Sequence, residues 1–165
     1  MHLPLVVVMG VSGSGKSTIG EEIARTLMID FVDADSLHPP ANIAKMASGI
    51  ALTDEDRWPW LEIVGRTLAA AESTGLVLAC SSLKRSYRDL IRSQAPSVFF
   101  IHLSGSRKTL SARLARRGNH FMPSTLLDSQ LDSLQPLELD EAGMEIDIDL
   151  SVPEIVVLAL SRLDN

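Results

Sequence analysis

A glycine-rich segment near the start of the chain restricts the possible folds more than any other feature of the sequence. Residues 10–17 read Gly-Val-Ser-Gly-Ser-Gly-Lys-Ser and satisfy the pattern G-x-x-x-x-G-K-[ST] at every constrained position. An apolar run at 5–9 directly precedes the segment, and Ile19, Ile23 and Leu27 follow it at helical spacing. This strand, loop and helix context predicts a phosphate-binding loop (P-loop).

The residue types of this segment suit a nucleotide's phosphates. Glycines let the backbone curl so that its N–H groups point at phosphate oxygens, and the positive end of the following helix faces the same anion. Lys16 adds a mobile positive charge, and the Ser17 hydroxyl can ligate Mg²⁺. We therefore expect ATP and Mg²⁺ as cofactors. The residues expected to bind the nucleotide are Gly10, Ser12, Gly13, Ser14, Gly15, Lys16, Ser17 and Thr18.

The rest of the chain alternates short apolar runs with longer segments of helical period. This alternation is typical of an α/β fold, here a five-stranded, mostly parallel sheet with helices on both faces. The candidate strands are 5–9, 31–33, 76–80, 98–103 and 144–148, and the candidate helices are 16–27, 41–47, 59–72, 85–93, 107–116, 125–134 and 153–163. A length of 165 residues predicts a single domain over 1–165.

Charge and cysteine content narrow the class further. The net charge of −6 argues against a protein that binds nucleic acid through the phosphate backbone. Cys80 is the only cysteine and lies in an apolar run, so we expect a buried thiol and a reducing compartment. The first apolar run is too short to span a membrane and lacks an export signal's charged start. We expect a cytoplasmic protein without nucleic-acid or membrane partners.

Two carboxylates follow the second predicted strand. Asp33 and Asp35 point to one face if the strand stays extended, and this end of a parallel sheet faces the ligand crevice. Asp33 can hold Mg²⁺ through a water molecule, and Asp35 can accept a hydroxyl proton or orient that hydroxyl for in-line attack. The alternative is a solvated turn in which Asp35 caps the next segment. His38 can hydrogen-bond a polar substrate, although a lone histidine is more often structural.

Two basic segments can supply positive charge to the same crevice. Lys84 and Arg88 are one helical turn apart just beyond the third predicted strand. Arg113 and Arg117 have the same spacing before Gly-Asn at 118–119, which can end a helix and act as a hinge. We expect a mobile lid at approximately 113–123 that brings guanidinium groups to the transferring phosphoryl group. The alternative for both segments is a solvated helix face.

Longer motifs resemble the small gluconate kinases of the P-loop class, relatives of shikimate and nucleoside-monophosphate kinases. The similarity extends over nearly the whole chain. The matching stretches are 10–17, 35–39 (DSLHP), 42–49 (NIAKMASG), 54–57 (DEDR), 59–61 (PWL), 80–84 (CSSLK) with 87–88, and 120–122 (HFM) with Gln130 and 134–135. The resemblance implies ATP-dependent phosphorylation of D-gluconate at its terminal (6-) hydroxyl, giving 6-phosphogluconate and ADP. It also implies a homodimer.

The resemblance implies roles for individual residues as well. A sugar acid presents one carboxylate and a row of hydroxyls, so its site needs cations at one end and carboxylate or imidazole partners along the chain. The implied residues are Arg57, Lys84 and Arg88 for the carboxylate, Asp35, His38 and His120 for the hydroxyls, and Lys16, Asp35, Arg113 and Arg117 for catalysis. Lys45 lies in a matching motif, where a place in the site and a place on a helix surface are equally consistent.

Two rival functions compete with this interpretation. The first is another small-molecule kinase of the same fold, for shikimate or a nucleoside monophosphate, and the motifs at 37–39 and 84–88 argue against it. The second is a nucleotide-dependent switch or binding module without turnover. It would need an acceptor side that lacks Asp35 or the lid arginines, and the sequence has both.

Overall fold

A five-stranded sheet forms the centre of the computed structural model, which describes residues 2–117 and 124–164. Its strands are β1 (Leu5–Met9), β2 (Asp30–Asp33), β3 (Leu76–Ala79), β4 (Phe99–Ser104) and β5 (Gly143–Asp147), in the order β2-β3-β1-β4-β5. All four strand pairings are parallel, so the sheet is wholly rather than mostly parallel. The predicted fold class is confirmed.

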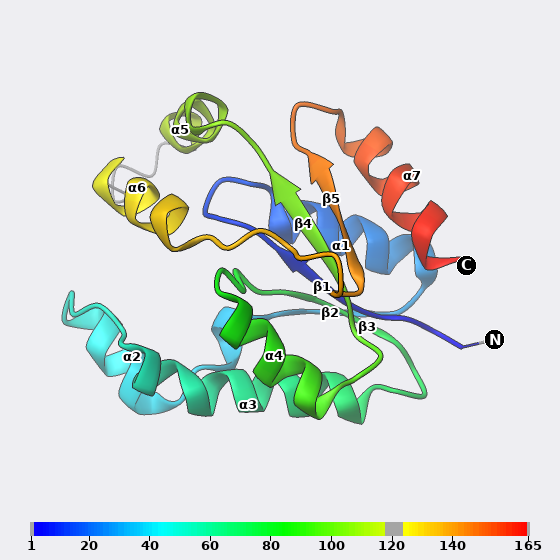
Figure 1. Ribbon diagram of the computed structural model, residues 1–165, viewed down its shortest axis with the longest axis horizontal. Coiled ribbons are helices and arrows are strands. Elements are labelled where there is room, and N and C mark those ends of the chain that lie inside the picture. The colour runs from blue at the N-terminus through cyan, green and yellow to red at the C-terminus, as the bar shows by residue number, and fades with distance from the viewer. Residues whose placement is uncertain (1, 118–123, 165) are drawn as a thin grey trace.

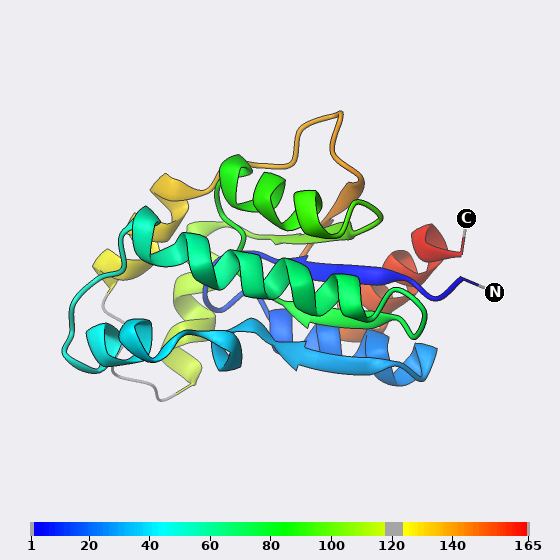
Figure 2. The same cartoon turned by 90° about the horizontal axis from the view of Figure 1, so that it is seen from below.

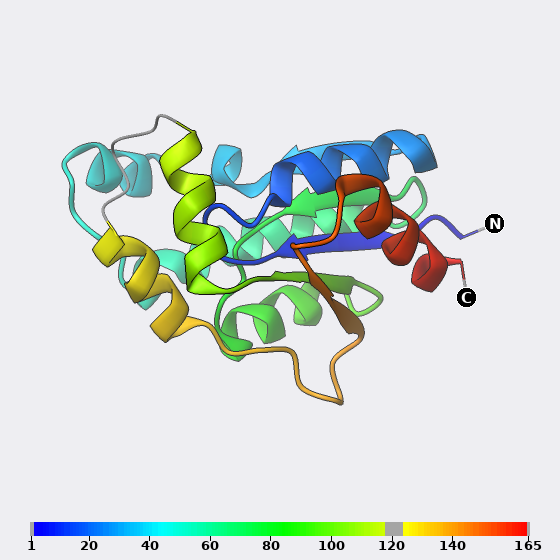
Figure 3. The same ribbon diagram turned by 90° about the horizontal axis from the view of Figure 1, so that it is seen from above.

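Helices cover both faces of the sheet (Figure 1). They are α1 (Lys16–Leu27), α2 (Pro40–Ala47), α3 (Asp54–Ala70), α4 (Arg85–Gln94), α5 (Arg107–Arg116), α6 (Ser124–Ser133) and α7 (Val152–Leu163), with a short 3₁₀ helix, η1, at Ala34–Leu37. Figure 2 shows α3 and α4 across one face, and Figure 3 shows α1 and α7 across the other. Helices α5 and α6 lie beyond the carboxyl ends of the strands. No helix in the described part of the chain is long and apolar enough to cross a membrane.

Strand β1 shows why the apolar runs are continuous. Leu5, Val7 and Met9 pack into the core under α3 and α4, while Val6 and Val8 pack into the core under α1 and α7. All five side chains are buried. A strand covered on both faces requires apolar residues at every position, as the sequence predicted.

The predicted start of α3 was wrong by five residues, because the helix begins at Asp54 and not at Pro59. Thr53 caps it: the Thr53 hydroxyl accepts from the Asp56 N–H, and the Asp56 carboxylate accepts from the Thr53 N–H. Pro59 therefore lies inside the helix and removes one N–H donor near its beginning. All other predicted bounds lie within two residues of those observed.

Candidate active site

The predicted phosphate loop connects β1 to α1 and curls as its glycines allow. Gly13 and Gly15 have φ values of 86° and 94°, in the left-handed region that favours glycine. The Gly10 N–H donates to the Ser81 carbonyl (3.2 Å), which links the loop to the end of β3. A cavity of about 400 Å³ opens in front of the loop. It is lined by Ser12, Gly13, Gly15, Lys16, Ser17, Asp33, Asp35, Ala79, Cys80, Ser81, Leu114 and Arg117.

Lys16 starts α1 and reaches back over the loop, where its ammonium donates to the Val11 carbonyl at 3.2 Å. Burial lowers the pKa of Lys16, and the charges of Asp35 and Asp33 partly oppose this effect. A phosphate entering the cavity would favour the charged form of Lys16 in the same way. The position and electrostatics of Lys16 therefore suit the binding of a nucleotide's terminal phosphates.

Asp33 and Asp35 both line this cavity, although β2 ends at Asp33 and Asp35 lies in η1. Asp33 is the residue that caps η1, since its Oδ1 accepts from the Asp35 N–H at 3.0 Å. The capping role that we considered for Asp35 thus belongs to Asp33. The Asp35 side chain is exposed within the cavity and can meet a substrate hydroxyl.

Ser17 and Asp33 form the part of the cavity that fits Mg²⁺. The Ser17 hydroxyl donates to Asp33 Oδ2 at 3.3 Å, so two hard oxygen ligands lie side by side next to Lys16. Within residues 2–117 and 124–164, no group of three or more His, Cys, Asp or Glu side chains could hold a metal. A magnesium ion here would therefore need phosphate oxygens and water molecules to complete its coordination, as is usual at kinase sites.

A second cavity of about 350 Å³ also borders the loop. Its lining combines loop residues with arginines of α5 and apolar residues near α7: Gly13, Ser14, Gly15, Thr18, Ile19, Arg113, Arg116, Arg117, Leu150, Val152 and Ile155. Arg117 lines both cavities, and Arg113 donates to the Ile148 carbonyl just after β5. The structure thus brings both predicted lid arginines to the phosphate loop.

His38 has a defined hydrogen-bonding state beside Asp35. The ring is stacked on Trp60, with centroids 4.1 Å apart, and Nδ1 lies 3.2 Å from Asn42 Nδ2. The same Asn42 nitrogen donates to the Asp56 carbonyl at 3.0 Å, so it is a donor and Nδ1 must accept. Burial lowers the pKa of His38, against the effect of Asp35. His38 is therefore held neutral with its hydrogen on Nε2, as a donor.

Two of the three cations predicted for a substrate carboxylate meet around Asp54. Lys84 Nζ lies 3.2 Å from one Asp54 oxygen, and Arg57 Nη1 lies 3.5 Å from the other. Tyr87 donates its hydroxyl to Asp54, and both cations lie over its ring, at 5.6 and 5.7 Å from the centroid. Helix α3, which carries Asp54 and Arg57, packs against the segment of Asp35 and His38, since Trp60 stacks on His38 and donates to the Ala34 carbonyl at 2.8 Å. Lys45 is separate from it and pairs with Asp56 at 2.7 Å.

Arg88 has a different environment from the one we expected. Its side chain is fully buried and forms a two-point ion pair with Glu141, at 2.7 and 2.9 Å. Its remaining N–H groups donate to the carbonyls of Ser82, Leu83 and Pro136. All five N–H groups are thereby used, so in this arrangement Arg88 has no donor left for a substrate carboxylate. The helical spacing of Lys84 and Arg88 was correct, but Arg88 faces Glu141 and not the crevice.

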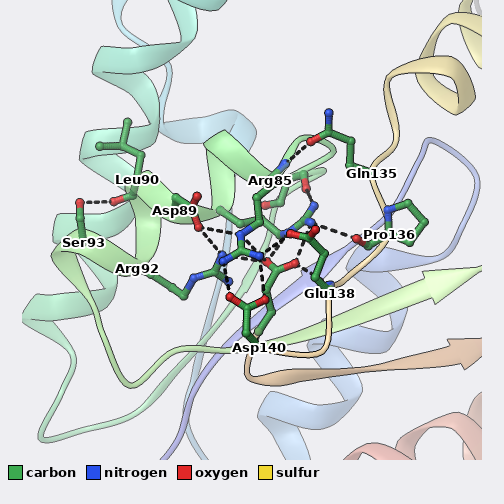
Figure 4. A network of polar contacts seen from close by, with 12 residues as sticks. Arg85, Asp89, Leu90, Arg92, Ser93, Gln135, Pro136, Glu138 and Asp140 are labelled. Atoms are coloured by element: carbon green, nitrogen blue, oxygen red, sulfur yellow. Dashed lines mark hydrogen bonds and ion pairs between the residues drawn. The ribbon is translucent and has the colours of Figure 1, made fainter.

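The Arg88 pair belongs to a network that holds the segment after β3. Figure 4 shows the neighbouring contacts, in which Arg85 pairs with Asp140 and Arg92 pairs with Asp89. Ser82, whose carbonyl Arg88 binds at 3.0 Å, is buried and has a φ of 48°, a strained value for a residue other than glycine. The network therefore stabilises the backbone that leads from the cavity to Lys84.

Some predicted positions lie outside the described residues. These are His120 and the Gly-Asn hinge at 118–119, so the described part of the expected lid is the end of α5 with Arg113 and Arg117. Sequence reasoning assigned no role to Asp54, Tyr87 or Gln130, although each lies in a motif that we quoted. It gave no signal for Glu141, whose partner lies 53 residues away.

The phosphate loop, the parallel sheet and the lysine, serine and carboxylate groups of one cavity define a P-loop kinase. The family model for shikimate kinase matches residues 12–155, so the chain belongs to that family of kinases. The thermosensitive gluconokinase of Escherichia coli (strain K12) is 45% identical over 153 residues, covering 90% of this chain and 81% of that protein. Within the kinases, the chain therefore belongs to the gluconokinase family.

Two solved structures agree with this assignment. A gluconokinase from Sinorhizobium meliloti 1021 superimposes with a TM-score of 0.88 at 48% identity, over 98% of this chain and 91% of that one. An unliganded sugar kinase from Janibacter sp. HTCC2649 gives a TM-score of 0.90 at 45% identity, over 98% and 95% of the two chains. The similarity covers the sheet, the phosphate loop and the acceptor side together.

Proposed function

We propose that this protein transfers the γ-phosphoryl group of ATP to the terminal (6-) hydroxyl of D-gluconate, giving 6-phosphogluconate and ADP. The observation that carries the proposal is one cavity in which Lys16 and Ser17 of the phosphate loop meet the exposed carboxylate of Asp35. Arg57 lies on α3, whose Trp60 stacks on His38, and it shares Asp54 as an ion-pair partner with Lys84. The gluconokinase names of the relatives support the choice of substrate.

The chain's own residues divide the transfer step between them. The gluconate hydroxyl oxygen attacks the γ-phosphorus, and the new O–P bond forms as the bond to the β-phosphate oxygen breaks. Asp35 orients this hydroxyl and accepts its proton. Lys16 and Arg117 hold the phosphoryl oxygens, with Arg113 beside them. An arginine in such a position contributes a factor of about 10³ to 10⁵ in rate.

Ser17 and Asp33 are the residues that would hold Mg²⁺, Ser17 directly and Asp33 through a water molecule. Bound there, the ion would supply positive charge that neutralises part of the charge on the phosphates. The hydrogen bond from Ser17 to Asp33 at 3.3 Å holds the two oxygens next to each other in the absence of nucleotide.

Recognition of gluconate follows from the charges on the acceptor side. Arg57 and Lys84, which Asp54 holds in place, bind the substrate carboxylate, and the His38 Nε2–H donates to a hydroxyl. His120, outside the described residues, stays a predicted hydroxyl ligand. A neutral sugar would lack the partner for the two cations, so we expect selection of a sugar acid.

The experiment is ADP release by the purified protein with ATP and Mg²⁺ against gluconate, shikimate, nucleoside monophosphates and no acceptor. We expect release with gluconate alone and a product whose phosphorus couples to the C6 protons in NMR spectra. Release with shikimate or a nucleoside monophosphate would show that the proposed substrate is wrong, while the assignment as a kinase would stand. Equal release with and without every acceptor would contradict transfer to a small molecule.

A further inference from the structure

The phosphate loop is bonded at two points to a glutamine of α6. The Ser12 N–H donates to Gln130 Oε1 at 2.8 Å, and Gln130 Nε2 donates to Ser12 Oγ at 3.1 Å. Because a backbone N–H can only donate, the orientation of the Gln130 amide is fixed by its partner. Two residues separated by 118 positions in the sequence thus form a closed pair at the mouth of the loop.

This pair determines what the Ser12 hydroxyl can do. A serine hydroxyl has a single hydrogen, and here the Ser12 oxygen accepts a hydrogen from Gln130. Its own hydrogen therefore points away from Gln130. Ser12 lines the cavity that also contains Lys16, Asp35 and Arg117, so an anion bound in that cavity can accept this hydrogen.

We propose that Gln130 is a positioning residue for phosphoryl transfer, which fixes the Ser12 hydroxyl as a hydrogen-bond donor to the transferring phosphoryl group. The proposal rests on the function proposed above. Donors that are already aimed at developing charge need no reorganisation during the reaction, and one such donor is typically worth about 10² to 10³ in rate. Gln130 acts through Ser12, so its removal costs less than the removal of the hydroxyl.

Helix α6 does not depend on Gln130 for its attachment. Leu127, on the same helix, is 1% exposed and packs in the core under α1 and α7, and Asp128 pairs with Arg107 of α5. A variant that removes the Gln130 amide therefore keeps the helix in place. This separation of attachment from hydrogen bonding makes the proposal testable with folded protein.

The test uses the full chain with Gln130→Met, which keeps the length of the side chain and removes both hydrogen bonds, together with Ser12→Ala and the double variant. Ser129→Ala, an exposed neighbour on α6, is the matched control. We measure kcat and KM with ATP and gluconate, and dissociation constants for ADP and for the non-hydrolysable analogue AMPPNP. The melting temperature of each variant verifies its fold.

We expect Gln130→Met to lower kcat about 10-fold and Ser12→Ala about 10²- to 10³-fold, with the double variant no worse than Ser12→Ala alone. AMPPNP, which carries a γ-phosphate, should bind both single variants several-fold more weakly, while ADP binds them as it binds the unchanged protein. Gln130→Glu should be slower than Gln130→Met, because a carboxylate accepts the Ser12 hydrogen and turns it away from the cavity.

Two results would overturn the proposal: kcat and AMPPNP affinity unchanged in Gln130→Met, or equal losses for ADP and AMPPNP, which indicate general damage to the loop. The activity of the unsubstituted protein distinguishes failure of this proposal from failure of the proposed function. If it fails to phosphorylate gluconate, the proposed substrate is wrong, and the comparison of AMPPNP with ADP still decides the role of Gln130.

Discussion

Removal of the Arg88 guanidinium should strongly destabilise the fold. In Arg88→Met, Glu141 keeps its place in the core and its contact with Arg92 at 2.8 Å, but it loses both bonds to Arg88, which are 2.7 and 2.9 Å long. Both side chains of this pair are 0% exposed, so water cannot replace the lost partner. Breaking a buried pair by removing one member typically costs about 3 to 5 kcal/mol.

The electrostatics of Glu141 give a similar magnitude. Although burial alone would raise its pKa, hydrogen bonds from Arg88, the Glu138 N–H and Arg92 lower it from the usual 4.5 to about 2. At about 1.4 kcal/mol for each unit of pKa, the pairing is worth on the order of 3 kcal/mol. Because the pKa is lower in the folded state, this contribution is complete above about pH 4.5 and is lost as the pH falls toward 2.

The assay is urea unfolding followed by circular dichroism, with Arg85→Met as the matched control on the same helix. Apart from a longer contact with Glu141 at 3.9 Å, the Arg85 ion pairs involve carboxylates that are more than half exposed, so we expect a loss of at most about 1 kcal/mol there. In addition, Glu141→Gln should show a shallower loss of stability than the unchanged protein between about pH 4.5 and 2.

A second variant distinguishes the cost of a buried carboxylate that has lost its main partner from the cost of lost packing. Arg88→Met combined with Glu141→Leu removes both charges, and it should recover a large part of the stability that Arg88→Met loses. The reasoning would be refuted by a loss below about 1 kcal/mol in Arg88→Met, or by a double variant that is less stable than Arg88→Met itself.

Four further variants test the site. Lys16→Ala should abolish transfer with an unchanged melting temperature, and normal turnover would contradict the phosphate-loop assignment. Asp35→Asn should lower kcat far more than gluconate affinity, measured by calorimetry, and an unchanged rate would remove its role in orienting the hydroxyl. Arg117→Ala should lower kcat by about 10³ or more, and equal rate and ATP affinity would rule out its contact with the phosphates. Lys84→Met should raise the KM for gluconate at least 10-fold while the KM for ATP stays constant, which a general defect could not produce.

Local patterns predicted the fold because each strand and helix carries its own signal. The alternation of faces in β1 requires apolar residues at every position, and the phosphate loop needs its glycines at fixed places. The start of α3 was placed at Pro59, although Thr53 and Asp56 form a complete capping box that begins six residues earlier. The two hydrogen bonds of this cap stabilise the helix start more than the missing N–H of Pro59 destabilises it.

The site was predicted where its residues lie on a recognisable loop or motif. Lys16, Ser17, Asp33 and Asp35 meet in one cavity, as expected. Arg88 was misplaced because helical spacing tells which residues share a face and not what that face packs against. The single domain, the homodimer and the cytoplasmic location stay predictions.

Long-range pairing was the information that the sequence lacked. Glu141 pairs with Arg88 across 53 residues, and Gln130 pairs with Ser12 across 118 residues. Neither pair has a spacing rule, since the contact depends on how whole elements pack together. Such partners become visible only when the tertiary structure is known.

The single cysteine gives this chain a practical advantage for spectroscopy. Cys80 is 3% exposed, and burial raises the pKa of its thiol to about 11, so the thiol stays protonated and shielded at neutral pH. Maleimide dyes should therefore react much more slowly with the native thiol than with exposed cysteines introduced elsewhere. A donor fluorophore on α2 and an acceptor on α5 could then report the distance between these helices during turnover, without first removing any native residue.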